Sequence, residues 1–343
     1  MLKTFDEICT FPVVYDAYLA ARRGKRSKAA TAKYEAHALE NVSNLVYILR
    51  TQLYRPGPFH LFTVYEPKER LVQAPAFTDK VVQHALVDNV VYERLTRSFI
   101  LDNYASQISK GLHFGLDRLS GFMTDYWNKH HTAGGWVLKC DVRKFFASID
   151  HDILKTKLLA LDFEPEIYTM LCNYIDSTDG LPLGYQTSQL FALLFLDRFD
   201  HYVKEVLRIR YYGRYMDDFF LIHPDKEYLQ FCLREIHAFM ASVNLELNEK
   251  THIFPLRNGI DFLGFHTYLT DSGKVIRKLR HNSVKKMRAK LRYWAKAYPK
   301  GEVDRDAILA SWQAWDAHAA HGNTWRLRQE IRQQVKEILK EDI

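Results

Sequence analysis

The chain has 343 residues, of which 47% are hydrophobic and 26% charged, so its composition is that of a globular protein and excludes a disordered or fibrous one. The net charge of +7 comes from one segment, 274–300, in which every charged residue is Lys or Arg; without it the chain would be net acidic. Four scattered cysteines without a CxxC pair indicate neither a disulfide framework nor a zinc site, and the lack of a signal sequence or a long apolar run predicts a cytoplasmic protein.

The first part of the chain is predicted to contain helices around one β-hairpin. Apolar residues at spacings of three and four predict a helix with one apolar face, formed by Leu39, Val42, Val46, Leu49 and Leu53. The RPGP sequence at 55–58 ends this helix, because proline cannot continue it. Residues 59–75 then predict a β-hairpin whose turn contains Pro67, and helical spacing returns over 79–95.

The second part is predicted to combine strands and helices before a helical tail. The expected elements are a buried strand at 134–141, a long helix at 188–207, two strands within 210–223, an amphipathic helix at 229–247 and short strands around an Asn258-Gly259 turn. The tail from Ser283 is expected to be helical, and its core is expected to contain Trp294, Trp312, Trp315 and Trp325. This order predicts an α+β architecture with helices on one face of a sheet.

Two adjacent aspartates, Asp217 and Asp218, separate an aromatic-rich run from the apolar run FFLI. Aspartate is a poor strand former, so one reading is a solvated hairpin tip, although the Gly or Asn usual in such turns is missing. The other reading is a pair of metal-binding carboxylates, and Asp141 at the end of the strand 134–141 supplies the third. Two strands that deliver carboxylates to one sheet edge can hold two divalent cations, and Mg²⁺ prefers such oxygen ligands. Nearby Asp150 reads instead as the N-cap of a helix.

Residues 138–150 (LKCDVRKFFASID) resemble motif A of reverse transcriptases, and residues 215–218 (YMDD) resemble their motif C. Similar blocks follow the order of that family: the fingers block at 64–86, motif B at 180–197, motif D at 247–251 and motif E, the primer grip, at 259–265. The resemblance covers residues 4–330. It implies an α+β right-hand polymerase with fingers and N-terminal helices at 1–130, a palm with an antiparallel sheet and the catalytic aspartates at 131–270, and a basic helical thumb at 271–343.

Motif B points to one branch of the family. Most bacterial reverse transcriptases have PQGxxxSP there, whereas this chain has PLGYQTSQ at 182–189, with Leu183 in place of Gln and Gln189 in place of Pro. The pattern resembles the reverse transcriptases of diversity-generating retroelements, which implies error-prone copying, most clearly opposite template adenine. One departure is Gln107, which stands where the second fingers block of the family has Arg and favours a divergent relative, such as those of antiphage defence.

The resemblance also implies roles for individual residues. The catalytic residues would be Asp141, Asp217 and Asp218, which with the carbonyl of Val142 would bind two Mg²⁺ ions, for which Mn²⁺ can substitute. Residues expected to bind the incoming nucleotide are Lys68, Arg70, Lys110, Phe146 (as a steric gate against a 2′-hydroxyl), Leu183 and Lys250. Residues expected to bind template or primer are Ser188, Gln189, Phe262, Leu263, Gly264, Lys285, Lys286 and Lys290.

Several of these residues have a plainer alternative. Lys68, Arg70 and Lys250 would be exposed loop cations, and Phe146 would be a core aromatic. Tyr293 and Trp294 would stack on bases or, as we favour, pack in the thumb core. The basic run at 21–33 would contact RNA or be solvated.

The predicted function is RNA-directed DNA polymerase. Its expected partners are an RNA template, a DNA or RNA primer and dNTPs, with a non-coding RNA and an accessory protein in addition, and no membrane. Two biological roles stay open: mutagenic copying of a template repeat, and antiphage defence with cDNA made from a non-coding RNA. A third possibility, an inactive nucleic-acid-binding relative, is disfavoured because all three aspartates are present.

Overall fold

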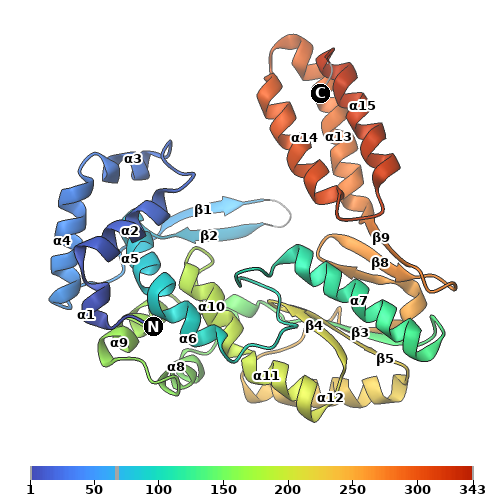
Figure 1. The fold of residues 1–343 in the computed structure, drawn as a ribbon, viewed down its shortest axis with the longest axis horizontal. Coiled ribbons are helices and arrows are strands. Elements are labelled where there is room, and N and C mark those ends of the chain that lie inside the picture. The colour runs from blue at the N-terminus through green and yellow to red at the C-terminus, as the bar shows by residue number, and fades with distance from the viewer. Residues whose placement is uncertain (1, 66–68, 342–343) are drawn as a thin grey trace.

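The structure is a computed structural model that describes residues 2–65 and 69–341 of the chain. Figure 1 shows a central region of β-strands, with the N-terminal helices at one end of the molecule and three C-terminal helices standing over the other. Within the described residues, no helix combines the length and the apolar character needed to cross a membrane.

The N-terminal helices pack together and against α5. They are α1 (Phe5–Ile8), α2 (Phe11–Arg22), α3 (Ala29–Glu35) and α4 (Ala38–Arg50). The end of α4 before the RPGP sequence confirms the prediction. Its buried face consists of Val42, Leu45 and Leu49, whereas Leu39 and Leu53 are exposed. The predicted apolar face was therefore wrong at both ends, because Leu39 lies in the first turn of the helix and Leu53 beyond its last residue.

A β-hairpin and a long helical segment follow. β1 (His60–Val64) and β2 (Arg70–Ala74) pair in antiparallel register, with Val64 opposite Arg70, and so confirm the predicted hairpin. Pro67, expected in its turn, lies outside the described residues. The helical segment is α5 (Phe77–Leu86), a π-helical stretch η1 (Val87–Val91) and α6 (Tyr92–Thr96).

The central sheet has four antiparallel strands in the order β4-β5-β3-β6. They are β3 (Trp136–Asp141), β4 (Tyr211–Tyr215), β5 (Asp218–His223) and β6 (His252–Pro255). Leu138 and Phe219 face the main core, which includes α12 (Lys226–Ser242), whereas Val137 and Phe220 face α7 (Leu112–His130). The prediction of helices on one face only was wrong. Strands whose two faces are both apolar must be covered on both. The helix α7, which covers the second face, was not predicted from the sequence.

The long helix that the sequence predicts beside the sheet is divided in the structure. The single helix expected over 188–207 is divided into α10 (Gln186–Phe195), α11 (Asp197–His201) and the π-helical η3 (Tyr202–Val206). Along the chain, three shorter segments lie between β3 and α10: η2 (Phe145–Ser148), α8 (His151–Leu159) and α9 (Pro165–Ile175). The Asp150 side chain accepts hydrogen bonds from the amides of Asp152 and Ile153, both at 3.0 Å, which confirms that Asp150 caps α8.

A second, three-stranded sheet lies next to the palm sheet. Its strands are β7 (Ile260–Phe262), β8 (Phe265–Leu269) and β9 (Val275–Leu279), preceded by the 3₁₀ turn η4 (Leu256–Asn258). The basic segment that begins at residue 274 therefore starts as a strand. The predicted boundary between residues 270 and 271 falls in the turn that joins β8 to β9. The helix α7 packs on β4 and β8, so it lies with the sheets although it belongs to the range 1–130.

The C-terminal helices form a three-helix bundle. They are α13 (His281–Ala297), α14 (Arg305–Ala319) and α15 (Trp325–Leu339), with the short turn η5 (Tyr298–Lys300) after α13. Trp294 and Trp312 are buried in the core of the bundle and Trp315 packs against it, as predicted. Trp325 is 69% exposed, so its predicted core role was wrong. Tyr293 is 54% exposed, so the core reading holds for its neighbour alone.

Candidate active site

The β4–β5 hairpin carries the aspartate pair at a two-residue loop. Tyr215 pairs with Asp218, which leaves Met216 and Asp217 as the loop. Met216 has a φ of +57°, a left-handed conformation that costs a non-glycine residue about 1–3 kcal/mol. The Arg214 guanidinium opposes this cost by donating a hydrogen bond from Nη1 to the Met216 carbonyl oxygen at 2.9 Å. The loop is tied to the protein interior, so the alternative of a solvated hairpin tip is wrong.

Arg214 is fully buried and supports this loop. Its Nε and Nη2 donate to the two carboxylate oxygens of Asp200 at 2.7 and 2.6 Å. Its main chain bonds to the carbonyl of Asp102 and to the amide of Tyr104, both at 2.9 Å. A guanidinium held by two parallel bonds to a carboxylate has one orientation, so its third contact fixes the loop relative to α11. The pairing of Arg214 with Asp200 was not predicted from the sequence, because no local pattern joins residues 200 and 214.

Asp141 and Asp217 are the two carboxylates that the structure brings into contact. Asp141 ends β3 opposite Asp218 of β5, and the amide of Val142 donates to the Asp217 carbonyl oxygen at 3.0 Å. Burial raises the pKa of Asp217, and the Asp141 carboxylate raises it further through its charge and a hydrogen bond between the two groups. Two carboxylates that repel each other in a partly buried site are stabilised by a nearby cation.

Lys139 lies beside the aspartates and pairs with Asp218. Its ammonium group contacts the Asp218 carboxylate and lies 5.0 Å from the centre of the Phe262 ring. Burial lowers the pKa of Lys139 to about 8 against the raising effect of the nearby acidic groups. The sequence analysis did not single out Lys139, although a signal was present. Side chains two positions apart on a strand share a face, so Lys139 had to lie beside Asp141.

The donor atoms at this sheet edge fit Mg²⁺. The carboxylates of Asp141 and Asp217 meet there beside the main chain of Val142, and Mg²⁺ prefers carboxylate and carbonyl oxygens. Asp218 is opposite Asp141 but is engaged by Lys139. In the part of the chain that the structure describes, no group of three or more His, Cys, Asp or Glu side chains is arranged so that it could hold a metal ion. The pair therefore offers two carboxylates to a cation, and the metal-binding roles of Asp141, Asp217 and Asp218 stay predictions.

Arg70, one of the residues expected to bind the incoming nucleotide, lies close enough to Asp217 for its charge to act on that carboxylate. It is the first residue of β2, and its positive charge opposes the rise in the pKa of Asp217 that burial and Asp141 cause. Lys68 lies outside the described residues. Lys250 is exposed in a turn within motif D, as its loop alternative expects.

Lys110 and Phe146 have contacts inside the protein. The Lys110 ammonium group donates to the carbonyl oxygens of Ile100 and Asn103 at 3.1 and 3.0 Å, so it holds its own loop. The Phe146 ring is partly buried and packs against the cluster that contains Met216. That contact places the ring next to the Met216-Asp217 loop, where a steric gate would have to lie. The role of Phe146 as a gate stays a prediction.

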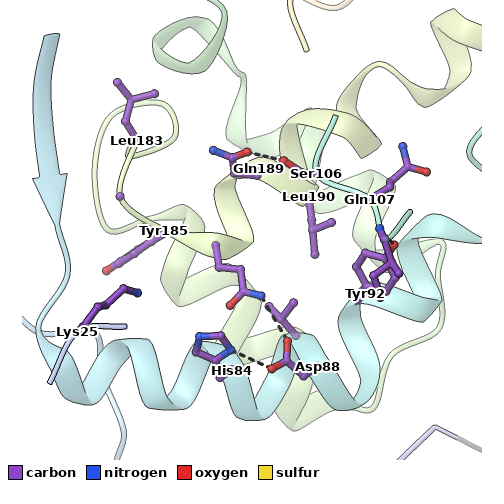
Figure 2. A pocket seen from close by; sticks show the side chains of 14 residues that line it. Lys25, His84, Asp88, Tyr92, Ser106, Gln107, Leu183, Tyr185, Gln189 and Leu190 are labelled. Atoms are coloured by element: carbon purple, nitrogen blue, oxygen red, sulfur yellow. Dashed lines mark hydrogen bonds and ion pairs between the residues drawn. The ribbon is translucent and has the colours of Figure 1, made fainter. Parts of the chain in front are cut away.

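Motif B lines a cavity of about 760 Å³ between its loop, the start of α10 and the helices α5 and η1 (Figure 2). Leu183 lies on the loop and is 37% exposed. A Cβ on Gly184 would collide with the carbonyl oxygen of Gln73, so glycine lets the loop touch β2. The Gln189 side chain is bonded to Ser106 at 2.5 Å. Ser188 is fully buried, so the expected direct contact of Ser188 with template has no accessible oxygen.

The predicted primer grip is the tight turn between β7 and β8. Leu263 and Gly264 have φ values of +49° and +88°, and the Gly264 carbonyl oxygen accepts a bond from the amide of Arg280 at 3.1 Å. Phe262 is buried, with 1% of its surface exposed, so it supports the turn from inside the protein, and its expected role in positioning the primer end stays a prediction. The turn itself is the part of motif E that a primer strand can reach.

The three lysines expected to bind nucleic acid lie on the exposed side of α13. Lys285, Lys286 and Lys290 are all exposed, whereas Met287 and Leu291 of the same helix are buried in the bundle. Lys290 also donates to the Ser311 hydroxyl at 2.9 Å. The helix thus has a basic outer face and an apolar inner face, which is compatible with the predicted role.

Known proteins similar to this chain indicate its family and agree with its fold. Residues 66–267 match the family described as reverse transcriptase (RNA-dependent DNA polymerase). The chain is 26% identical over 271 residues to Protein YkfC of Escherichia coli (strain K12), an overlap that covers 63% of this chain and 69% of YkfC.

Two solved structures of telomerase have a similar fold. One is telomerase from Candida albicans in complex with a TWJ fragment of telomeric RNA (TM-score 0.51, 12% identity, 90% of this chain and 66% of that chain). The other is apo telomerase from Candida tropicalis (TM-score 0.51, 12% identity, 89% and 62%). This chain therefore spans less than two thirds of the telomerase chains. The likeness shows the fold, and it confirms the predicted right-hand polymerase architecture.

Proposed function

This chain belongs to the reverse transcriptase family, and from that premise we propose that it is an RNA-directed DNA polymerase that adds dNTPs to a primer 3′-hydroxyl. The observation that carries the proposal is the contact between Asp141 and Asp217 at the end of β3, in the two motifs where the family has its aspartates. An inactive nucleic-acid-binding relative would have no need to keep this repelling pair.

The residues of the site would have two roles, binding the metal ions and orienting the incoming nucleotide. Asp141 and Asp217, with the main chain at Val142, would hold two Mg²⁺ ions, for which Mn²⁺ can substitute. When bound, these ions would activate the primer 3′-hydroxyl and neutralise the leaving pyrophosphate. Arg70 would orient the triphosphate by charge-assisted hydrogen bonds, together with Lys68 and Lys250. Asp218 would join the metal site after it separates from Lys139.

The template and the primer would lie on either side of this site. Gln189, at the start of α10, would meet the RNA template beside the motif B cavity. Leu263 and Gly264 would hold the primer end, and the thumb lysines would bind the backbone of the RNA–DNA duplex. Phe146 would exclude a 2′-hydroxyl. We further propose the ranges 1–130, 131–270 and 271–343 as fingers, palm and thumb.

A finer proposal concerns fidelity and biological role. Leu183 has no group that can hydrogen-bond to the nascent base pair, which supports error-prone copying of the kind found in diversity-generating retroelements. Gln107 supports the alternative role in antiphage defence. Its Nε2 donates to the Asn103 carbonyl oxygen at 2.8 Å, so it closes its own loop where the family's Arg would be free to contact phosphate.

Primer extension tests the activity directly. The full chain should add dNTPs to a primer annealed to RNA when Mg²⁺ is present, and no extension under any divalent cation would contradict the proposal. Sequencing the cDNA made in cells, together with the RNA that co-purifies, separates the two biological roles. A template-repeat RNA with substitutions at adenines supports the retroelement, and faithful copies of one non-coding RNA support defence.

A further inference from the structure

Three histidines meet at the junction of α7, the β7–β8 turn and the α14–α15 turn. His113 is in the first turn of α7, His318 in the last turn of α14, and His321 in the turn that follows. The rings of His113 and His321 are stacked with their centroids 3.3 Å apart. The Nε2 of His318 would lie 3.1 Å from a Cβ added to Gly264. These three residues are called the histidine cluster below.

The packing of α7 brings this cluster to the primer grip. A Cβ added to Gly115 would lie 2.8 Å from the Tyr104 ring and 3.0 Å from Cδ1 of Leu263, so the glycine allows the first turn of α7 to touch the β7–β8 turn. From the other side, the Phe265 and His318 rings are 4.8 Å apart. The cluster therefore lies at the turn that carries Leu263 and Gly264.

No protein group explains what these imidazoles bind. Some histidines elsewhere have a carboxylate partner, such as His84 with Asp88 at 2.9 Å and His266 with Asp261 at 2.8 Å. In residues 2–65 and 69–341, by contrast, no hydrogen bond reaches a ring nitrogen of the cluster. His113 and His321 are exposed, so their N–H groups are open to a ligand.

The electrostatic surroundings favour an anion. Asp117 is the carboxylate that faces His321, but it is paired with Arg277 at 3.0 Å, and Arg277 also donates to the His321 carbonyl oxygen at 2.9 Å. Burial lowers the pKa of His318, and the positive charges of the other two imidazoles lower it further. The uncapped N-terminus of α7 adds its positive dipole end. An anion placed here would relieve the repulsion among these groups.

We propose that the histidine cluster binds a backbone phosphate of the primer strand, close to its 3′ end. This inference rests on the proposed polymerase function, because that function puts a strand end at Gly264. The ring N–H groups of His113 and His321 would donate to the phosphate oxygens, and His318 would hold the β7–β8 turn against the same strand. Phosphate contacts of this kind fix register and carry no sequence information. The cluster would therefore position primers of any sequence.

The test measures binding of the full chain to a DNA primer annealed to an RNA template, without catalysis. His113→Phe and His321→Phe keep an aromatic ring but lose its N–H donors, whereas His113→Gln keeps a donor and serves as the conservative rescue. The matched control is His237→Phe, an exposed histidine on α12. The primer is also prepared with a neutral methylphosphonate in place of each phosphate near its 3′ end, one at a time.

Wild type should lose about tenfold in affinity at one methylphosphonate position, which corresponds to about 1.4 kcal/mol. The two Phe variants should lose a similar factor on the unmodified primer and no further factor at that position, while His113→Gln and His237→Phe bind nearly as wild type. Equal affinities of wild type and Phe variants, with no position coupled to the histidines, would overturn this inference and leave the polymerase intact. A wild type that binds no primer–template would overturn both.

Discussion

At the scale of single residues, the site depends on charges that are buried in pairs. Arg214 and Asp200 are fully buried and opposite in sign, and the pair holds the strained Met216 next to Asp217. Removing one member of a buried pair costs more than the pair itself contributes, because the remaining charge is left without compensation. The same buried pair therefore contributes to the stability of the fold and fixes the orientation of the Met216-Asp217 loop.

Asp200→Asn should lower the free energy of unfolding by about 3 kcal/mol or more, because the Arg214 charge then faces a neutral amide in the core. Urea unfolding followed by circular dichroism measures the change. Glu93→Gln is the control, since it breaks the ion pair of Glu93 with Arg97, whose side chains are 56% and 66% exposed, and it should change stability far less. Equal effects of the two substitutions would contradict the role given to the buried pair.

Leu183→Gln should reduce misincorporation, most clearly opposite template adenine, while overall activity falls less than about tenfold. A side-chain amide at this position can bridge to the incoming nucleotide, and a net hydrogen bond of about 1.4 kcal/mol corresponds to tenfold in selectivity. Incorporation of single correct and incorrect dNTPs on one RNA template measures the ratio. An unchanged ratio would mean that Leu183 only packs in its loop.

Single residues were predictable from the sequence where a motif or a strand face identified them. Asp141 and Asp217 lie together as the strand ends required, and Asp150 is the cap that its position before α8 predicted. Ser188 was misplaced, because the sequence does not show that the start of α10 is buried. Arg214 with Asp200 could not be found, since contacts between distant buried charges leave no local pattern.

At the scale of elements, caps and glycines set where segments start and how closely they approach. Asp150 stabilises the first turn of α8, and its carboxylate also accepts a bond from the Asn244 amide at 2.8 Å. The bonds from Ile153, Asn244 and Asp152 lower the pKa of Asp150. Because the pKa is lower in the folded state, this stabilisation is present above the unfolded pKa of about 3.9 and is lost as the pH falls through the folded value.

Asp150→Ala should lower the free energy of unfolding by about 1 kcal/mol at neutral pH, the usual effect of a lost N-cap. The difference from wild type should shrink below about pH 4, where the Asp150 carboxylate of the unfolded chain becomes protonated, and should be lost once the pH passes the lower pKa of the folded state. Chemical unfolding at several pH values measures both effects. Asp271→Ala, which changes an exposed aspartate between β8 and β9, is the control, and a difference that persists in acid would argue against the cap.

The elements themselves were predicted well where the periodicity was strong. The β-hairpin and the strands around the aspartates lie where the sequence placed them. The helix predicted over 229–247 is present as α12, but it ends at Ser242, five residues earlier than predicted. The division of residues 188–207 into three segments was not visible, because all of them keep helical spacing. The helix α7 was missed, and with it the second covered face of the sheet. An apolar strand does not say how many helices will pack on it.

At the scale of the whole molecule, the charge distribution separates a basic thumb from a palm whose site gathers carboxylates. The likeness to telomerase confirms the architecture, and the sequence resemblance had already predicted it. The junction of thumb and palm could not be predicted, because it depends on contacts such as those of Arg277 with Leu116 and Ser120. Those contacts join residues more than 150 positions apart.

Reversing the charge of Lys285, Lys286 and Lys290 should weaken binding of the RNA–DNA duplex and flatten its salt dependence. Each lost phosphate contact should reduce the slope of log K against log salt by about 0.9. Titrations of labelled primer–template over a range of salt measure the slope. Reversing Lys226 and Arg234, the two exposed basic residues of α12 on the far side of the sheet, is the control and should leave the slope unchanged. An unchanged slope would mean that this face of α13 does not meet nucleic acid.

The central claim is that Asp141 and Asp217 form the catalytic pair, and one measurement tests it most directly. Asp217→Asn should fold as wild type and bind primer–template, but its dNTP incorporation on a primed RNA template with Mg²⁺ should fall to background, because the site loses one of its two paired carboxylates. Asp271→Asn, a distant exposed aspartate, should extend the primer as wild type does. Near-normal incorporation by Asp217→Asn would contradict the claim.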